Sequence, residues 1–274
     1  MEIENQMKNL FVSFKVKDQT YGLGADVVES IFELKQELTP VPKTSDCVMG
    51  LIPMRGAFMP VIDLRRVMNM ESLDQEENAF IQMLHDRKQD HIRWVEQLEK
   101  SVEEGEPFTL ATDHHKCAFG KWYDHYQAPS HAVRLAMGGI DKPHQIIHRS
   151  AIDCLACQGD LEKQRQIIKR VTIPSMNGVL RGIDQMIAEY TSTKRKMCIA
   201  LSDKGTRFGL AVDQILSVEQ MDKIQPVDAM GENELVYAYA ASKSEEHILL
   251  MDSTKIFAML HKLAVARPAE PENA

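Results

Sequence analysis

Several features typical of membrane, secreted and nucleic-acid-binding proteins are missing from this sequence. No apolar run approaches the roughly 20 residues that a membrane-spanning helix needs. The N-terminal stretch MEIENQMKNL lacks the basic and then apolar order of a secretory signal. The formal net charge is −8, whereas phosphate binding needs a concentrated basic surface. We therefore expect no membrane insertion and no nucleic acid as a partner.

The spacing of a disulfide framework and the motifs of nucleotide-binding enzymes are missing too. The five cysteines are irregularly spaced and odd in number, which favours reduced thiols and a cytoplasmic location. There is no P-loop and no kinase signature, and we interpret Gly138-Gly139 as a turn that does not cradle a phosphate. A chain of 274 residues is long enough for one large domain or two ordinary ones.

Both ends of the chain carry patterns of short β-strands. Residues 11–16 alternate with a period of two, which is typical of a strand. Residues 50–65 predict two short strands around a glycine turn. We interpret Asp63 and Asp213 as caps of strand ends.

The C-terminal part repeats elements of the N-terminal part. Residues 208–218 and residues 21–31 share the order aromatic, Gly, Leu, two variable residues and Asp. Residues 248–253 resemble residues 60–64, in the same relative order along the chain. This repetition predicts a duplicated β unit. Short strands separated by Gly and Pro favour small barrels, because closure removes exposed sheet edges.

Between about residues 71 and 194 the apolar spacing changes to three and four residues, which predicts helices. The first helix carries His91 on its apolar stripe and should end at Gly105. A second helix is expected to begin near Asp113 and to carry Cys117.

The remaining helices are predicted from proline and glycine. Pro143 suits the first turn of a third helix, and Gly159-Asp160 should end that helix. The last helix should run from about residue 161 to 190, with Pro174 kinking or dividing it. Together these helices predict an antiparallel bundle.

Histidines are concentrated in this helical region. Eight of the ten lie between His85 and His148, and Cys117 lies among them. His144 and His148 are spaced i, i+4, so that one helix face presents both imidazoles to a single ion. With His91 and the thiolate of Cys117 they make a complete tetrahedral set for Zn²⁺.

Other candidate residues receive simpler interpretations. Asp113 either orients a ligand or is a solvated carboxylate at a helix N-terminus, and the sequence leaves both open. Cys154 and Cys157 form a C-x-x-C for which core packing is favoured over a redox role or a second metal. Five histidines are interpreted as surface residues or neighbours of the site: His85, His114, His115, His125 and His131.

The helical region resembles the chemoreceptor zinc-binding domain over about residues 80–190. The matching stretches are His91–Trp94, Cys117–Tyr123 and His144–His148. The resemblance implies that the three histidines and Cys117 bind zinc inside a helical bundle, with Trp94 and Trp122 packed behind them.

The outer segments resemble the CheW-like chemotaxis coupling proteins, over about residues 8–70 and 195–262. The strongest matches are Gly50–Arg65 and Phe208–Ile215. This resemblance implies an α+β fold with two small SH3-like five-stranded β-barrels, and no catalytic chemistry. It also implies an adaptor that joins the cytoplasmic tip of chemoreceptors to the regulatory domain of a histidine kinase.

Arg55 and Gly56 match the last two residues of a motif in that family. The resemblance implies that Arg55 and Gly56 contact a receptor. Pro53-Met54 stands where that family usually has Asn-Leu, which leaves the choice of partner open.

The combined prediction is a cytoplasmic, non-enzymatic adaptor with a discontinuous domain over residues 8–70 and 195–262. A zinc-binding bundle over residues 75–192 is inserted into it, and a disordered tail covers residues 263–274. The bundle, which is a possible site of homodimerisation, is expected to join the two barrels. It should change shape with zinc level or with oxidation of the Cys117 thiolate.

Two alternatives stay open. Zinc could only stabilise the inserted bundle without signalling. Less favoured is a zinc-dependent hydrolase, because four protein ligands close the site and Gln145 stands where the metalloprotease motif has its general-base Glu.

Overall fold

A computed structural model describes residues 9–265, apart from residues 36, 222, 228–234 and 242–246. The chain forms two compact units. Residues 1–75 and 195–274 form the β unit, and residues 76–194 form the helical unit. The predicted disordered tail lies outside the described residues from residue 266 onward, and its first three residues belong to a helix. No helix in the described part of the chain has the length and apolarity needed to cross a membrane.

The β unit consists of strands that the alternating and apolar patterns produce, plus short helices. The strands before the helical unit are β1 (Leu10–Val16), β2 (Gln19–Gly24), β3 (Val28–Glu33), β4 (Val48–Met54) and β5 (Ala57–Asp63). The strands after it are β6 (Met197–Asp203), β7 (Thr206–Val212), β8 (Gln214–Gln220), β9 (Ile224–Pro226), β10 (Val236–Ala241) and β11 (His247–Met251). The helices are the short η1 (Ala25–Val27), α2 (Leu64–Val67) and α8 (Ser253–Val265).

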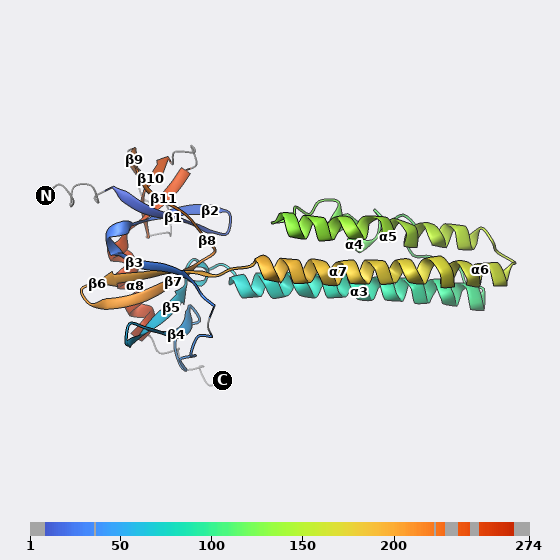
Figure 1. The fold of residues 1–274 in the computed structure, drawn as a ribbon, viewed down its shortest axis with the longest axis horizontal. Coiled ribbons are helices and arrows are strands. Elements are labelled where there is room, and N and C mark those ends of the chain that lie inside the picture. Colours follow the sequence, from blue (N-terminus) through green and yellow to red (C-terminus); the bar gives the residue numbers. More distant parts are fainter. Residues whose placement is uncertain (1–8, 36, 222, 228–234, 242–246, 266–274) are drawn as a thin grey trace, which may run out of the picture. The chain divides into compact units, whose positions relative to one another are not determined.

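The strands form two mixed sheets whose order reveals the duplication. One sheet has the order β3-β6-β7-β5-β4, and the other β8-β1-β2-β11-β10-β9. In chain order, the counterparts of β1, β2, β3, β4 and β5 in the second copy are β6, β7, β8, β10 and β11. When each strand of the first sheet is replaced by its counterpart, the order becomes β8-β1-β2-β11-β10, which is the order of the first five strands of the second sheet. Each sheet therefore takes its central hairpin from one copy and its outer strands from the other (Figure 1).

The α+β prediction, with a helical insertion within a duplicated β scaffold, is confirmed. The expected five strands are present in one sheet, whereas the other has a sixth, the three-residue β9. The apolar faces of both sheets contribute to one core, together with the apolar side of α8. This core includes the fully buried Phe14, Leu23, Ile62, Leu210 and Leu260.

Two aspartates at strand ends have different roles. Asp63 caps α2, because its carboxylate accepts a hydrogen bond from the Arg65 backbone N–H at 2.9 Å. Asp213 accepts from the Lys17 N–H at 2.6 Å, and also binds the Arg65 guanidinium at 2.6–3.0 Å. The capping prediction therefore describes Asp63 fully and Asp213 only in part.

The helical unit contains α3 (Leu73–Glu104), α4 (Ala118–Tyr123), α5 (His131–Leu155), α6 (Leu161–Ile167), the π-helical segment η2 (Ile168–Thr172) and α7 (Ile173–Thr193). As predicted, α3 ends at Gly105, whose φ of +73° is the left-handed conformation that glycine favours at a helix C-terminus. The predicted break at Gly159-Asp160 is also present, since Asp160 caps α6. The last helix is divided by η2 directly before Pro174.

The predicted start of the third helix was wrong. This helix begins at His131, capped by Ser130, so that Pro143 and Gly138-Gly139 lie inside α5. Upstream of Pro143, apolar residues recur at helical spacing and are buried in the core of the helical unit, among them Val133, Met137 and Ile140. Packing of this face therefore outweighs the weak helix propensity of the glycines.

α5 packs along α7 (Figure 1), and α7 has a glycine where the two helices approach each other closely. A methyl group on Gly182 would lie only 2.6 Å from the side chain of Ile140. The close approach of these helices therefore requires glycine at residue 182. This packing places α5, the helix that carries His144 and His148, next to α7.

Both connections of the helical unit lead into the same five-stranded sheet. β5 runs through α2 into α3, and residues 194–196 lead from α7 into β6. β5 and β6 both pair with β7. The expectation that the insertion joins one barrel to the other is therefore corrected, because both of its ends belong to one sheet.

Candidate metal centre

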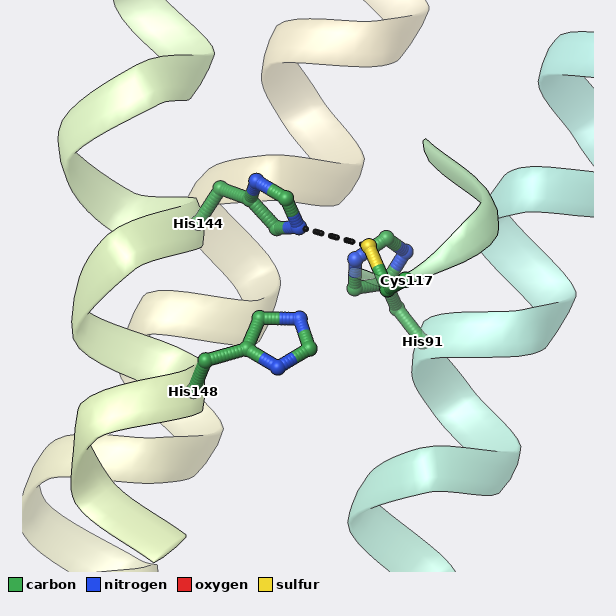
Figure 2. A group of neighbouring side chains, drawn as sticks. All are labelled: His91, Cys117, His144 and His148. Carbon is green, nitrogen blue, oxygen red and sulfur yellow. Dashed lines mark hydrogen bonds between the residues drawn. The ribbon is translucent and has the colours of Figure 1, made fainter. Parts of the chain in front are cut away.

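The four predicted ligands converge in the interior of the helical unit. His91 comes from α3, Cys117 directly precedes α4, and His144 and His148 lie on α5 (Figure 2). One ligand atom from each residue lies within 4.8 Å of all the others. In a tetrahedral zinc site, bonds of about 2.0–2.3 Å place ligand atoms roughly 3.3–3.8 Å apart. The cluster therefore needs only a small contraction to hold an ion of this size.

Two of the imidazoles are oriented by backbone carbonyl groups. His91 Nδ1 donates to the Arg87 carbonyl oxygen at 2.7 Å, and His148 Nδ1 donates to that of Ala111 at 2.8 Å. A carbonyl oxygen only accepts, so each proton lies on Nδ1 and the Nε2 lone pair is free to bind a metal. Both Nε2 atoms are buried without a hydrogen-bond partner. A buried nitrogen left in this way is unfavourable, and a metal ion would satisfy both.

Cys117 is positioned by the turn that begins α4. It is the N-terminal cap of this helix, and its sulfur accepts a hydrogen bond from the Gly120 N–H at 3.1 Å. The sulfur also lies 3.3 Å from Nε2 of His144 (Figure 2). A methyl group on Gly120 would lie 1.8 Å from the His114 carbonyl oxygen, so this turn requires glycine.

Burial keeps the imidazoles in the form that binds metals. It lowers the pKa of His144 to about 2 and that of His148 to about 4, and it lowers the pKa of His91 as well. All three are therefore neutral near pH 7. Burial raises the pKa of the Cys117 thiol, against the opposing effect of the Gly120 N–H. A bound Zn²⁺ would supply the positive charge that stabilises the thiolate.

Of the residues expected behind the ligands, Trp94 has the most direct role. Its indole N–H donates to the Ala111 carbonyl at 2.9 Å, the same oxygen that accepts from His148. The rings of Trp94 and His148 also pack together, with centroids 4.9 Å apart.

Trp122 packs against Phe119, with ring centroids 5.5 Å apart. Phe119 itself contacts two ligands edge-on, with its ring centroid 5.6 Å from that of His91 and 5.0 Å from that of His144. The sequence interpretation missed this residue. The sequence clue to its role was an aromatic side chain two positions after the predicted ligand Cys117.

Asp113 organises the chain before Cys117. Its carboxylate accepts from the His115 N–H at 3.0 Å and lies 3.6 Å from Nζ of Lys116. These contacts make Asp113 a cap of the turn that precedes Cys117. Nearby, His115 forms its own pair with Asp124 at 2.9 Å.

Arg55 and Gly56 form the turn between β4 and β5. Both have positive φ, +50° and +78°, as in a type I′ hairpin turn. The Arg55 guanidinium is paired with Glu29, which also binds Arg207 at 2.7 Å. The Arg55 side chain nevertheless remains 60% exposed.

Family models match two parts of the chain. That of the CheW-like domain matches residues 10–103, and that of the chemoreceptor zinc-binding domain matches residues 91–155. Over these residues the chain is similar to the CheW-like domain and to the chemoreceptor zinc-binding domain. The second match begins at His91 and includes all four clustered residues.

Individual proteins agree with these matches. The chemotaxis protein CheW of Thermotoga maritima is 31% identical over 70 residues, which are 26% of this chain and 46% of that protein. The chain thus spans less than half the length of this CheW relative.

Two solved structures also resemble the chain. The scaffolding protein TtCheW of Thermoanaerobacter tengcongensis has a TM-score of 0.41 at 13% identity, covering 89% of this chain and 88% of that one. The regulatory CZB domain of DgcZ has a TM-score of 0.28 at 17% identity, covering 42% and 93%.

Proposed function

We propose that this protein is a non-enzymatic chemotaxis adaptor that joins chemoreceptors to a histidine kinase and binds Zn²⁺ in its helical unit. The two matched domain families, both non-enzymatic, support the adaptor role. The free cysteines agree with a cytoplasmic location for such an adaptor.

The metal-binding part of the proposal rests on one observation. Two buried Nε2 atoms without hydrogen-bond partners, those of His91 and His148, converge with Nε2 of His144 and the sulfur of Cys117. Three imidazoles and a thiolate suit zinc, a borderline-soft ion. Each side chain is already held by a carbonyl, a helix cap or core packing.

A hydrolase is less well supported than an adaptor. Four protein ligands leave no open place on the ion for a reacting water. Gln145, between the two histidines of α5, is exposed on the outside of the helix and cannot act as a base at the cluster.

We propose that the helical unit responds to zinc level or to oxidation of the Cys117 sulfur. Either event would remove a link between α3, α5 and the turn before α4. Both ends of the helical unit continue into the five-stranded sheet, and β5 leads directly from α2 back to the Arg55-Gly56 turn. A rearranged bundle would therefore act first on that sheet.

The proposed partners follow from the domain family. Arg55 and Gly56 are proposed to contact the receptor tip, and the same domain is proposed to bind the regulatory domain of the kinase. Association of two helical units into a homodimer is a further part of the proposal.

The decisive experiment measures zinc stoichiometry and affinity, with receptor-dependent kinase activity followed in parallel. The wild type should bind one zinc per chain, and Cys117→Ala should bind it far more weakly and lose the response to zinc and oxidant. Cys47→Ala, in the β unit, is the matched control and should behave as the wild type. If Cys117→Ala couples receptor and kinase like the wild type at every zinc and oxidant level, sensing is refuted. A site that holds zinc well below cellular free levels would support the purely structural alternative.

A further inference from the structure

Two cysteines outside the metal cluster lie together where α5 turns into α6. Cys154 belongs to the last turn of α5 and is fully buried, whereas Cys157 follows the end of the helix and is half-buried. Cys154 packs in the core of the helical unit, as the sequence predicted. Core packing does not account for Cys157, three residues further on.

The backbone between the two cysteines forms a tight turn. The Cys157 N–H donates to the Cys154 carbonyl oxygen at 3.1 Å. Residues at the ends of such a turn have Cα atoms less than about 7 Å apart. Disulfides span Cα distances of about 4.4–6.8 Å. The proximity of the thiols is also felt electrostatically, since the Cys157 thiol adds to the effect of burial in raising the pKa of Cys154.

We propose that Cys154 and Cys157 are a reversible dithiol–disulfide pair, oxidised by peroxides. This inference goes beyond the proposed function, because it needs neither zinc nor a chemotaxis partner. The half-buried Cys157 meets the oxidant, and the buried Cys154 completes the bond.

The chemistry balances in two steps. The Cys157 thiolate attacks a peroxide oxygen, so that sulfur is oxidised to a sulfenic acid and hydroxide leaves. The Cys154 sulfur then attacks the sulfenic sulfur, the S–O bond breaks, and the Cys154 proton leaves with the hydroxyl group as water. Two thiols and one hydrogen peroxide give one disulfide and two waters. Burial raises the pKa of Cys154 to about 11, so the second step should be the slower one.

Disulfide formation would also alter the corner of the bundle. In the reduced protein, hydrogen bonds between Cys154 and Gln164 link α5 to α6. The Cys154 thiol donates to the Gln164 carbonyl at 3.8 Å, and the Gln164 amide donates to the Cys154 carbonyl at 3.2 Å. Oxidation removes the first of these bonds. The candidate metal ligand His148 precedes Cys154 by six residues on α5, which is about 9 Å along the helix axis.

The test uses the full chain, hydrogen peroxide, thiol alkylation under denaturing conditions and digestion with trypsin. Cleavage after Arg149 and Lys163 places Cys154 and Cys157 in one peptide that contains no other cysteine. After oxidation this peptide should lose two hydrogens and escape alkylation, and a reductant should restore both thiols. Dimedone, added early, should trap a sulfenic acid on Cys157.

Three variants complete the test. Cys154→Ser should accumulate the trapped Cys157 sulfenic acid, Cys157→Ser should show neither product, and Cys47→Ser should behave as the wild type. Circular dichroism establishes that each variant is folded. Full alkylation of both cysteines after peroxide, or dimedone labelling of Cys154 in place of Cys157, overturns the proposal. Zinc affinity is measured on the same samples, and the outcome of the disulfide test does not depend on whether the protein binds zinc.

Discussion

Trp94 and His148 donate hydrogen bonds to the same acceptor, the carbonyl oxygen of Ala111. The carbonyl directs the proton of His148 to Nδ1 and leaves Nε2 facing the cluster. Trp94 in turn fixes the carbonyl, which belongs to the loop between α3 and α4. A tryptophan that touches no metal thus determines how a ligand is presented.

Trp94→Phe should therefore weaken zinc binding about 10–100-fold, the usual effect of removing a group that orients a metal ligand. The aromatic packing on His148 is largely kept, so the loss reports the missing N–H. Competition with a chromophoric zinc chelator measures the affinity. Trp122→Phe is the matched control and should change it much less, because Trp122 packs on Phe119. Equal affinities of Trp94→Phe and wild type would contradict the assigned role.

Gly120→Ala should destabilise the helical unit by about 1–3 kcal/mol, as overpacking usually does. The added methyl would meet the His114 carbonyl oxygen at 1.8 Å, and relief requires movement of the turn that holds Cys117. Zinc affinity should fall together with stability, and urea unfolding with and without zinc measures both. A variant as stable as the wild type would show that the turn is more adaptable than its contacts indicate.

Gly138→Ala should have the opposite effect. Gly138 lies inside α5 with no atom within 4 Å of where a Cβ would be. Alanine in such a place should stabilise the helix by about 0.5–1 kcal/mol, because less backbone entropy is lost on folding. Urea unfolding of the zinc-free protein provides the measurement. A loss of stability would indicate that this surface of α5 contacts something in solution, such as a second chain.

The features that could be predicted from sequence are those that depend on the spacing of residue types over a short stretch of chain. The strand patterns and the repeated aromatic-Gly-Leu order led to two sheets of matching topology. The i, i+4 spacing of His144 and His148 directed both toward one ion-sized space, because α5 is a regular helix there.

The features that could not be predicted depend on contacts distant in sequence. Gly138-Gly139 and Pro143 are breakers by propensity, and only the burial of Val133 and Ile140 against the bundle explains why α5 continues through them. The acceptor for His148 is a backbone carbonyl in a loop, and a carbonyl has no residue-type signature. The exchange of strands between the two copies likewise depends on pairing across the whole chain.

Arg65→Met should destabilise the β unit by about 3–5 kcal/mol. Arg65 is 5% exposed and binds the partly buried Asp213 carboxylate through both Nε and Nη2, so its removal leaves that carboxylate without its charged partner. Hydrogen-exchange mass spectrometry on peptides of the β unit measures the effect. The double variant Arg65→Met with Asp213→Leu should recover part of the loss. Arg66→Met, which changes the adjacent residue, serves as the control and should have a much smaller effect.

The zinc-free protein should lose stability as the pH falls from 7 to 5. An unfolded histidine has a pKa near 6.5. Burial lowers the folded values to about 2 for His144 and about 4 for His148. Below about pH 6.5 the unfolded chain therefore binds protons that the folded chain excludes, and each of these histidines contributes a slope approaching 1.4 kcal/mol per pH unit, an order-of-magnitude figure. Urea unfolding in chelator at several pH values measures the slope. His144→Leu should reduce it by that residue's share, whereas a wild-type stability that stays constant across this range would mean that the imidazoles are protonated inside the fold.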